Sequence, residues 1–159
     1  MSRGQIHRLE PEEVERRLLP LLQAGAEVPL VVTGESMRPF LRDRQDTVFL
    51  RGREFVPIRN GDILFFRRGN GQWTLHRFCR KCADGTLVVN GDAQTWTERI
   101  RPEQVAGVAV RIRRGERPPV SARRWPGGVI VWLWTLLRPV RPYLLAGLSR
   151  LRKWRSIWS

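Results

Sequence analysis

The middle of the chain is a succession of short apolar segments separated by glycine-containing turns. The turn signals are Arg59-Asn60-Gly61-Asp62, Gly69-Asn70-Gly71 and Ala83-Asp84-Gly85. Such clusters between segments rich in β-branched and aromatic residues are typical of hairpins. The pattern predicts a mainly β domain with strands at Val28–Thr33, Thr47–Arg51, Asp62–Arg67, Trp73–Arg80, Thr86–Asn90 and Val105–Arg113.

A short helix is expected before the first strand, over residues 11–24. Pro11 suits a first helical turn, glutamates follow it, and Gly25 can end the helix. Pro20 is awkward in the middle and could split it. The charged N-terminus has no apolar signal-peptide core, and the 159 residues suit one domain with a real core. The expected organisation is a helical leader at 1–26, a β domain at 27–116, a linker at 117–126 and a basic, Trp-rich tail at 127–159.

The C-terminal tail differs from the rest of the chain in charge and aromatic content. The net charge is +14, every acidic residue precedes position 121, and five of the seven tryptophans follow it. Basic residues interleaved with tryptophan indicate an anionic membrane interface. Residues 127–148 reach the length of a membrane span only by including two arginines and two prolines. This favours a monotopic or re-entrant amphipathic anchor, formed by an apolar, basic helical tail, over a clean span. A helix packed on the β domain is the third alternative.

Cys79 and Cys82 form a lone C-x-x-C pair within the sequence FCRKC. A zinc site of this kind needs a second pair of ligands at a suitable spacing, and the chain offers none. The pair is interpreted as a reducible disulfide or two free thiols, with no functional role, and neither a metal nor another cofactor is expected.

Ser36 lies in a bend directly after an apolar run, within the sequence VVTGESMRPFL. A serine becomes a nucleophile only when a base lies within hydrogen-bond reach. The two lysines, Lys81 and Lys153, fall in a cysteine turn and in the tail, and one of the two histidines, His7, falls in the charged leader. His76 is therefore the simplest base, with an ordinary pKa suited to proton transfer near neutrality.

A carboxylate is needed to hold such an imidazole in the correct tautomer. Asp92 follows Gly91 at the end of an apolar strand, and Glu98 comes six residues later. Taken alone, His76 is compatible with a hydrogen-bonded structural histidine, and Asp92 with a turn residue, because an Asp after Gly is most often found in a turn.

The ordered segments GESMRPFL, RNGDILFF, LHRF, NGDA and VAGVAVRI together resemble the successive boxes of the type I signal peptidase superfamily, which includes LexA-like self-cleaving repressors. The chain looks most like the Ser–His branch of the endoplasmic-reticulum and archaeal enzymes. The resemblance covers residues 28–112 and implies a signal peptidase/LexA-like β-ribbon fold.

The resemblance also implies roles for individual residues. Ser36 matches the nucleophile, His76 the general base and Asp92 the acidic partner, while Met37 and Pro39 complete the serine box. Glu98 stands where this branch has a second acidic residue, so Asp92, Glu98 or both could orient His76. Gly34 stands where many members have a serine that helps to bind the oxyanion, which leaves backbone N–H groups for that task. Asp62 matches a structural residue.

These observations predict a membrane-associated serine endopeptidase that cleaves signal or leader peptides, at a bacterial or archaeal membrane whose side stays open. A membrane protein partner is a further possibility. The alternatives are a LexA-like, self-cleaving or nucleic-acid-binding regulator and a catalytically silent membrane adaptor of the same fold. The high basic charge favours the regulator. The few residues before the β domain disfavour it, since they cannot hold a helix-turn-helix module.

Overall fold

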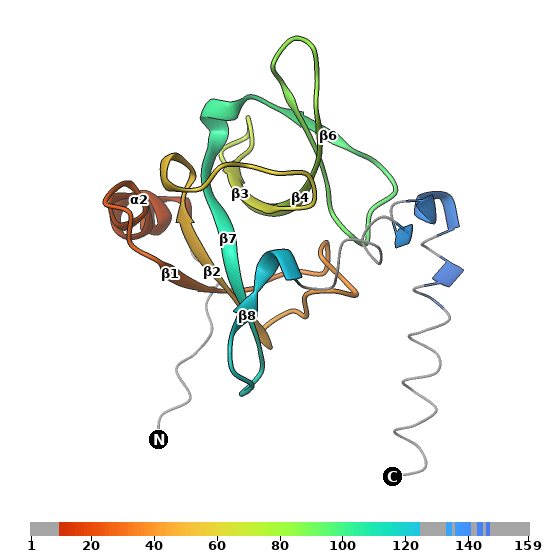
Figure 1. Cartoon of the computed structure of the whole chain (residues 1–159), viewed down its shortest axis with the longest axis horizontal. Coiled ribbons are helices and arrows are strands. Elements are labelled where there is room, and N and C mark those ends of the chain that lie inside the picture. Colours follow the sequence, from red (N-terminus) through yellow and green to blue (C-terminus); the bar gives the residue numbers. More distant parts are fainter. Residues whose placement is uncertain (1–9, 125–132, 135, 141–142, 145, 147–159) are drawn as a thin grey trace.

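A computed structural model describes residues 10–124, 133–134, 136–140, 143–144 and 146 (Figure 1). The N-terminal helical segment consists of α1 (Pro11–Glu13), the π-helical η1 (Val14–Leu18) and α2 (Leu19–Gln23). The π-helical stretch ends just before Pro20, which lies in the first turn of α2, where its missing N–H is tolerated. The expected helix is therefore continuous through the proline, and its hydrogen-bonding pattern changes there.

The domain is built on one antiparallel sheet of eight strands. Its spatial order is β1-β2-β7-β3-β4-β5-β6, and β8 pairs with β7. The strands are β1 (Val28–Val31), β2 (Asp46–Gly52), β3 (Ile63–Arg67), β4 (Trp73–Lys81), β5 (Leu87–Asn90), β6 (Glu98–Ile100), β7 (Val105–Arg114) and β8 (Val120–Ser121). Single turns of 3-10 helix lie at η2 (Arg53–Phe55), η3 (Pro102–Gln104), η4 (Ala122–Arg124) and η5 (Arg138–Val140). The predicted mainly β class and short N-terminal helix are thus confirmed.

All six predicted strands are present, and two short ones were missed. β6 has three residues and β8 has two, which is too short for an alternating pattern to be recognised. β8 lies within the segment expected to be a linker, where Val120 pairs with Ile112 and Ala122 is buried in the core. Residues 120–124 therefore belong to the folded β domain.

Two apolar clusters stabilise the domain and support different parts of the candidate site. In the first, Leu22 of α2 and Val14 of η1 pack with Met37 and Leu41, which follow Ser36 in the chain. The second cluster contains Leu64 and Phe66 of β3 and Phe78 of β4, together with residues of β5 and β7. The ring of Phe66 in this cluster contacts His76. The serine loop is thus anchored in the first cluster, whereas β4 contributes Phe78 to the second and packs Trp73 and Leu75 against the first.

The described tail residues lie on the side of the sheet away from α2 (Figure 1). Leu133, Trp134 and Leu136 are helical, and the N–H of Leu137 donates to the carbonyl of Leu133 at 3.0 Å. Within the described part of the chain, no helix has the length and apolar character required for a membrane crossing. Most of the predicted anchor at 127–148 falls outside the described residues.

Candidate active site

Ser36 is held in a bend whose neighbours are fixed on both sides. Gly34 has φ +92°, and its N–H donates to Oδ1 of Asp43 at 2.7 Å. Met37 is fully buried, and its carbonyl accepts from the N–H of Leu41 at 2.9 Å. The methionine after Ser36 is therefore a core anchor that leaves the serine half-buried at the surface.

The backbone of Ser36 is also tied to the loop after β5. Its carbonyl accepts from the N–H of Ala93 at 2.8 Å. A side chain at Gly91 would place a Cβ atom 2.8 Å from this same carbonyl oxygen, so glycine permits the close approach of the two loops. Among the described residues, neither the backbone N–H nor Oγ of Ser36 has a hydrogen-bond partner. Both groups remain available to a substrate.

His76 lies on β4 opposite Leu64 of β3 and is completely buried. Its Nδ1 is 2.8 Å from Oε1 of Glu98, a close contact between the ring and the carboxylate. Nε2 has no partner in the described part of the molecule. Edge-on contacts with Phe66 and Trp96 enclose the ring, with centroids 5.9 and 6.3 Å away.

Burial lowers the pKa of His76 from 6.5 to about 4, because the charged imidazolium loses its hydration. Glu98 opposes this effect and raises the pKa, whereas the positive charge of Arg68 lowers it. At neutral pH the imidazole is therefore uncharged, which is the state that a general base requires.

Glu98 is held in turn by Arg68, a residue that sequence reasoning did not identify. The guanidinium of Arg68 donates from Nε to Oε2 at 2.7 Å and from Nη2 to Oε1 at 2.6 Å. It also lies over the ring of Trp96, 6.0 Å from the centroid. Arg68 belongs to the turn between β3 and β4, and only the folded sheet brings it to Glu98, so no sequence signal marks it.

Asp92, the predicted acidic partner of His76, faces Arg77 instead. Oδ1 and Oδ2 of Asp92 accept from Nε and Nη2 of Arg77 at 2.8 and 2.6 Å, in a buried bidentate pair. His76 and Arg77 are consecutive on β4, so their side chains point to opposite faces of the strand. The expected contact between Asp92 and His76 is thus corrected: the carboxylate next to the imidazole is that of Glu98.

Ser36 and His76 line one cleft of about 670 Å³. Its walls also include Gly34, Met37, Arg68 and residues 29–33, which comprise the last three residues of the edge strand β1 and the two that follow it. The cleft therefore combines an unpartnered hydroxyl, a buried neutral imidazole with a carboxylate behind it, and a strand edge. This combination is suited to nucleophilic attack on a peptide carbonyl.

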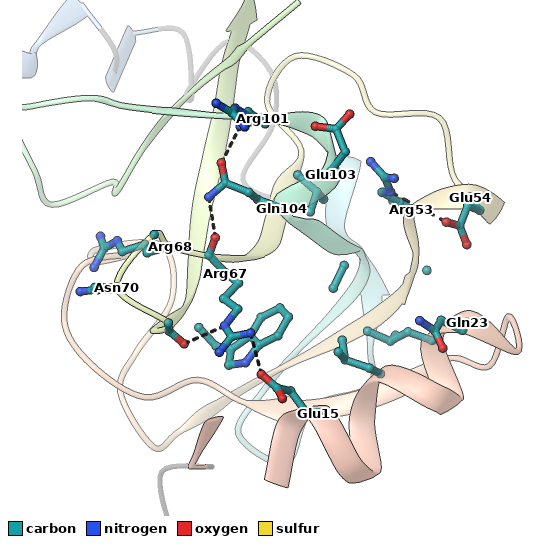
Figure 2. A pocket seen from close by; sticks show the side chains of 18 residues that line it. Glu15, Gln23, Arg53, Glu54, Arg67, Arg68, Asn70, Arg101, Glu103 and Gln104 are labelled. Atoms are coloured by element: carbon teal, nitrogen blue, oxygen red, sulfur yellow. Dashed lines mark hydrogen bonds and ion pairs between the residues drawn. The ribbon is translucent and has the colours of Figure 1, made fainter. Parts of the chain in front are cut away.

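A second cleft, of about 1300 Å³, lies between the N-terminal helical segment, the β3–β4 turn and residues 101–106 (Figure 2). Several of its charged groups are paired: Arg67 forms an ion pair with Glu15 at 2.8 Å, and Gln104 donates to the carbonyl of Arg67 at 2.8 Å. Arg68 and Trp73 line both clefts. Because these groups bind one another, they do not indicate the chemistry of a ligand for this cleft.

The remaining polar residues singled out in the sequence have structural surroundings. Asp62 accepts from Nε and Nη2 of Arg123 at 3.0 and 2.9 Å, which agrees with the structural role expected for it. Pro39 follows a cis peptide bond in the serine bend. Cys79 and Cys82 are not joined in a disulfide, and the described residues contain no group of three side chains suited to a metal ion.

A scan against protein-family models finds no family that matches this chain, and a search of curated proteins finds no related sequence.

Proposed function

We propose that the protein is a membrane-associated serine endopeptidase with a signal peptidase/LexA-like fold, which cleaves signal or leader peptides through an acyl-enzyme. One observation carries the proposal: Ser36 and His76 line the same cleft, and Glu98 lies behind the imidazole. The order of the sequence boxes supports the same assignment.

The reaction begins when Nε2 of His76 accepts the Oγ proton of Ser36 as Oγ bonds to the scissile carbonyl carbon. The tetrahedral intermediate collapses, and the leaving amine takes the proton from His76. Water then attacks the acyl ester, gives a proton to His76 and releases the new carboxyl end, while Oγ recovers its proton. Glu98 stabilises the transient imidazolium and fixes the ring orientation.

The oxyanion of the intermediate is bound by the backbone N–H of Ser36. The backbone N–H of Gly34 is unsuitable as a second oxyanion donor, because it already donates to Asp43. Removing one oxyanion donor costs about 2.7–4 kcal/mol in other hydrolases, so we expect a modest turnover from a site with few donors.

The substrate binds in an extended conformation along β1. This strand is at the edge of the sheet, and among the described strands it pairs with β2 alone. Pro29, Leu30 and Val31 of β1 also line the catalytic cleft. An added strand would place its peptide bonds across the mouth of the cleft.

Association with an anionic membrane is supported by the tail. Six of its described apolar side chains are exposed to solvent, and they belong to Leu133, Leu136, Leu137, Val140, Tyr143 and Leu144. Apolar side chains beside basic charge are suited to the interface of an anionic bilayer. The full chain should sediment with vesicles that contain phosphatidylglycerol, and a smaller fraction should sediment with vesicles of phosphatidylcholine alone. Recovery of equal amounts of the protein in the supernatant of both samples would contradict binding to an anionic membrane.

The peptidase activity is tested with the full chain in detergent and a leader peptide with small residues before the cut. Ser36→Ala should abolish cleavage, whereas Ser121→Ala, at an exposed serine on β8, should cleave like the wild type. Equal cleavage by wild type and Ser36→Ala would refute the proposal.

Two other outcomes would favour the alternative functions. A wild type that neither cleaves nor reacts with a fluorophosphonate probe at Ser36 would favour the silent adaptor. DNA binding with a steep dependence on salt would favour the regulator.

A further inference from the structure

Trp134, in the C-terminal tail, contacts the catalytic domain beside the serine loop. Its indole Nε1–H donates to the backbone carbonyl of Asp92 at 2.6 Å. Its ring meets Phe40 edge-on, with centroids 5.7 Å apart and an interplanar angle of 78°. Phe40 belongs to the same bend as Ser36. One side chain of the tail therefore touches both loops that surround the serine.

The hydrogen bond from Trp134 ends on a peptide group that also binds the serine loop. The carbonyl of Asp92 and the N–H of Ala93 belong to one peptide, and that N–H donates to the carbonyl of Ser36 at 2.8 Å. A peptide group that accepts at its oxygen becomes a stronger donor at its nitrogen, because hydrogen bonds in a chain polarise one another. Trp134, the Asp92–Ala93 peptide and Ser36 thus form a continuous series.

The surface beneath Trp134 is held together by hydrogen bonds and a buried ion pair. The Asp92 side chain is fixed by its bidentate pair with Arg77, and the guanidinium of Arg77 lies over the Phe40 ring, 5.5 Å from its centroid. Arg77 donates in addition to the carbonyl of Gly61 at 2.8 Å. The Asp92–Arg77 pair, which does not contact His76, therefore supports the place where the tail docks.

We propose that Trp134 is a positioning residue of the active site: it docks the tail on the Asp92–Ala93 peptide and so fixes the loop that carries Ser36. The tail then has a catalytic purpose in addition to membrane binding, because it holds the nucleophile in place even when a soluble peptide is cleaved. This inference rests on the proposed peptidase function.

The test compares Trp134→Phe with the wild type, as full chains in detergent without lipid. Phenylalanine keeps a ring against Phe40 but lacks the N–H donor. We expect kcat and the rate of fluorophosphonate labelling at Ser36 to fall about fivefold, the effect of one neutral hydrogen bond, with KM within about twofold. Trp134→Ala should reduce kcat and the labelling rate by more than Trp134→Phe does. Phe55→Leu, which changes an exposed aromatic residue in η2, serves as the control and should match the wild type.

Amide hydrogen exchange provides a second readout that does not depend on turnover. The Ala93 N–H should exchange faster in Trp134→Phe than in the wild type, while the melting temperature stays within a degree or two. A wild-type kcat and labelling rate in Trp134→Phe would overturn the inference, as would a change confined to KM. If the wild type itself fails to cleave or to be labelled, the proposed function is at fault, and the exchange rate of Ala93 still reports whether Trp134 secures the loop.

Discussion

Glu98 contacts the imidazole of His76 through Oε1 and Nδ1, 2.8 Å apart, while both carboxylate oxygens of Glu98 also accept hydrogen bonds from Arg68. The histidine therefore has an acidic partner whose own position is fixed by a bidentate arginine. This arrangement leaves Nε2 as the nitrogen that can face a nucleophile, and it separates the role of Glu98 from that of Asp92.

Replacing Glu98 with glutamine should reduce kcat by more than about tenfold. The amide keeps the shape of the side chain but cannot stabilise the imidazolium, and it can favour the wrong tautomer of His76. KM should change little, because Glu98 does not line the cleft surface that would hold the substrate. Steady-state cleavage of a leader peptide measures both constants, and an unaltered kcat would show that Glu98 does not assist His76.

Asp92→Asn is the matched comparison, and we expect its main effect on stability. The change leaves the buried guanidinium of Arg77 without its charged partner, which typically costs about 3–5 kcal/mol. Urea unfolding followed by circular dichroism should show this loss for Asp92→Asn and a smaller one for Glu98→Gln, since Glu98 is partly exposed. A smaller loss for Asp92→Asn than for Glu98→Gln would show that the Asp92–Arg77 pair contributes little to the stability of the fold.

The rate of cleavage should stay high at mildly acidic pH. The pKa of His76 is about 4, so the imidazole is largely neutral at pH 5.5, where an ordinary histidine would be about nine-tenths protonated. The acidic limb of kcat/KM should therefore lie near pH 4. Arg68→Met should move this limb to higher pH, because the charge of Arg68 lowers the pKa of His76. A limb near pH 6.5 in the wild type would contradict the buried environment of the ring.

The stability of the fold should depend on pH through the same residue. The folded-state pKa of His76 lies below the unfolded value of 6.5, so the unfolded chain binds more protons between pH 6.5 and about 4. Above pH 6.5 His76 is neutral in both states and does not reduce the free energy of unfolding. As the pH falls from 6.5 to about 4, the free energy of unfolding decreases by about 3 kcal/mol in total. Urea unfolding at several pH values should show a shallower dependence in His76→Gln, and an equal slope would show that other groups govern it.

The sequence predicted the strands well because each long strand carries a local signal in its apolar residues and turns. The same reasoning brought Ser36 and His76 together through the order of the sequence boxes, and both residues line one cleft. The two missed strands, β6 and β8, are held by pairing with longer neighbours. These strands form because the sheet provides a partner for them, and segments of three or two residues are too short to show an alternating pattern.

The acidic partner of His76 could not be chosen from the sequence because the choice depends on strand register. Arg77 pairs with Asn90, two residues before Asp92, and this register brings the Asp92 carboxylate to the face of β4 opposite His76. Trp134 was equally hidden: its basic and aromatic surroundings indicated a membrane interface, whereas its contact with Asp92 depends on where the folded tail returns to the domain.

Gly34 should resist replacement by the serine that many members of the resembled family carry at this position. Its φ of +92° is unfavourable for any residue with a side chain, although no atom lies within 4 Å of the site a Cβ would occupy. Strain of this kind typically costs about 1–3 kcal/mol. Gly34→Ser should therefore lower stability, as measured by urea unfolding, and should not raise kcat, because relieving the strain would displace the N–H that binds Asp43 and shift the Ser36 loop. A faster variant of unchanged stability would show that a serine hydroxyl here can serve the oxyanion after all.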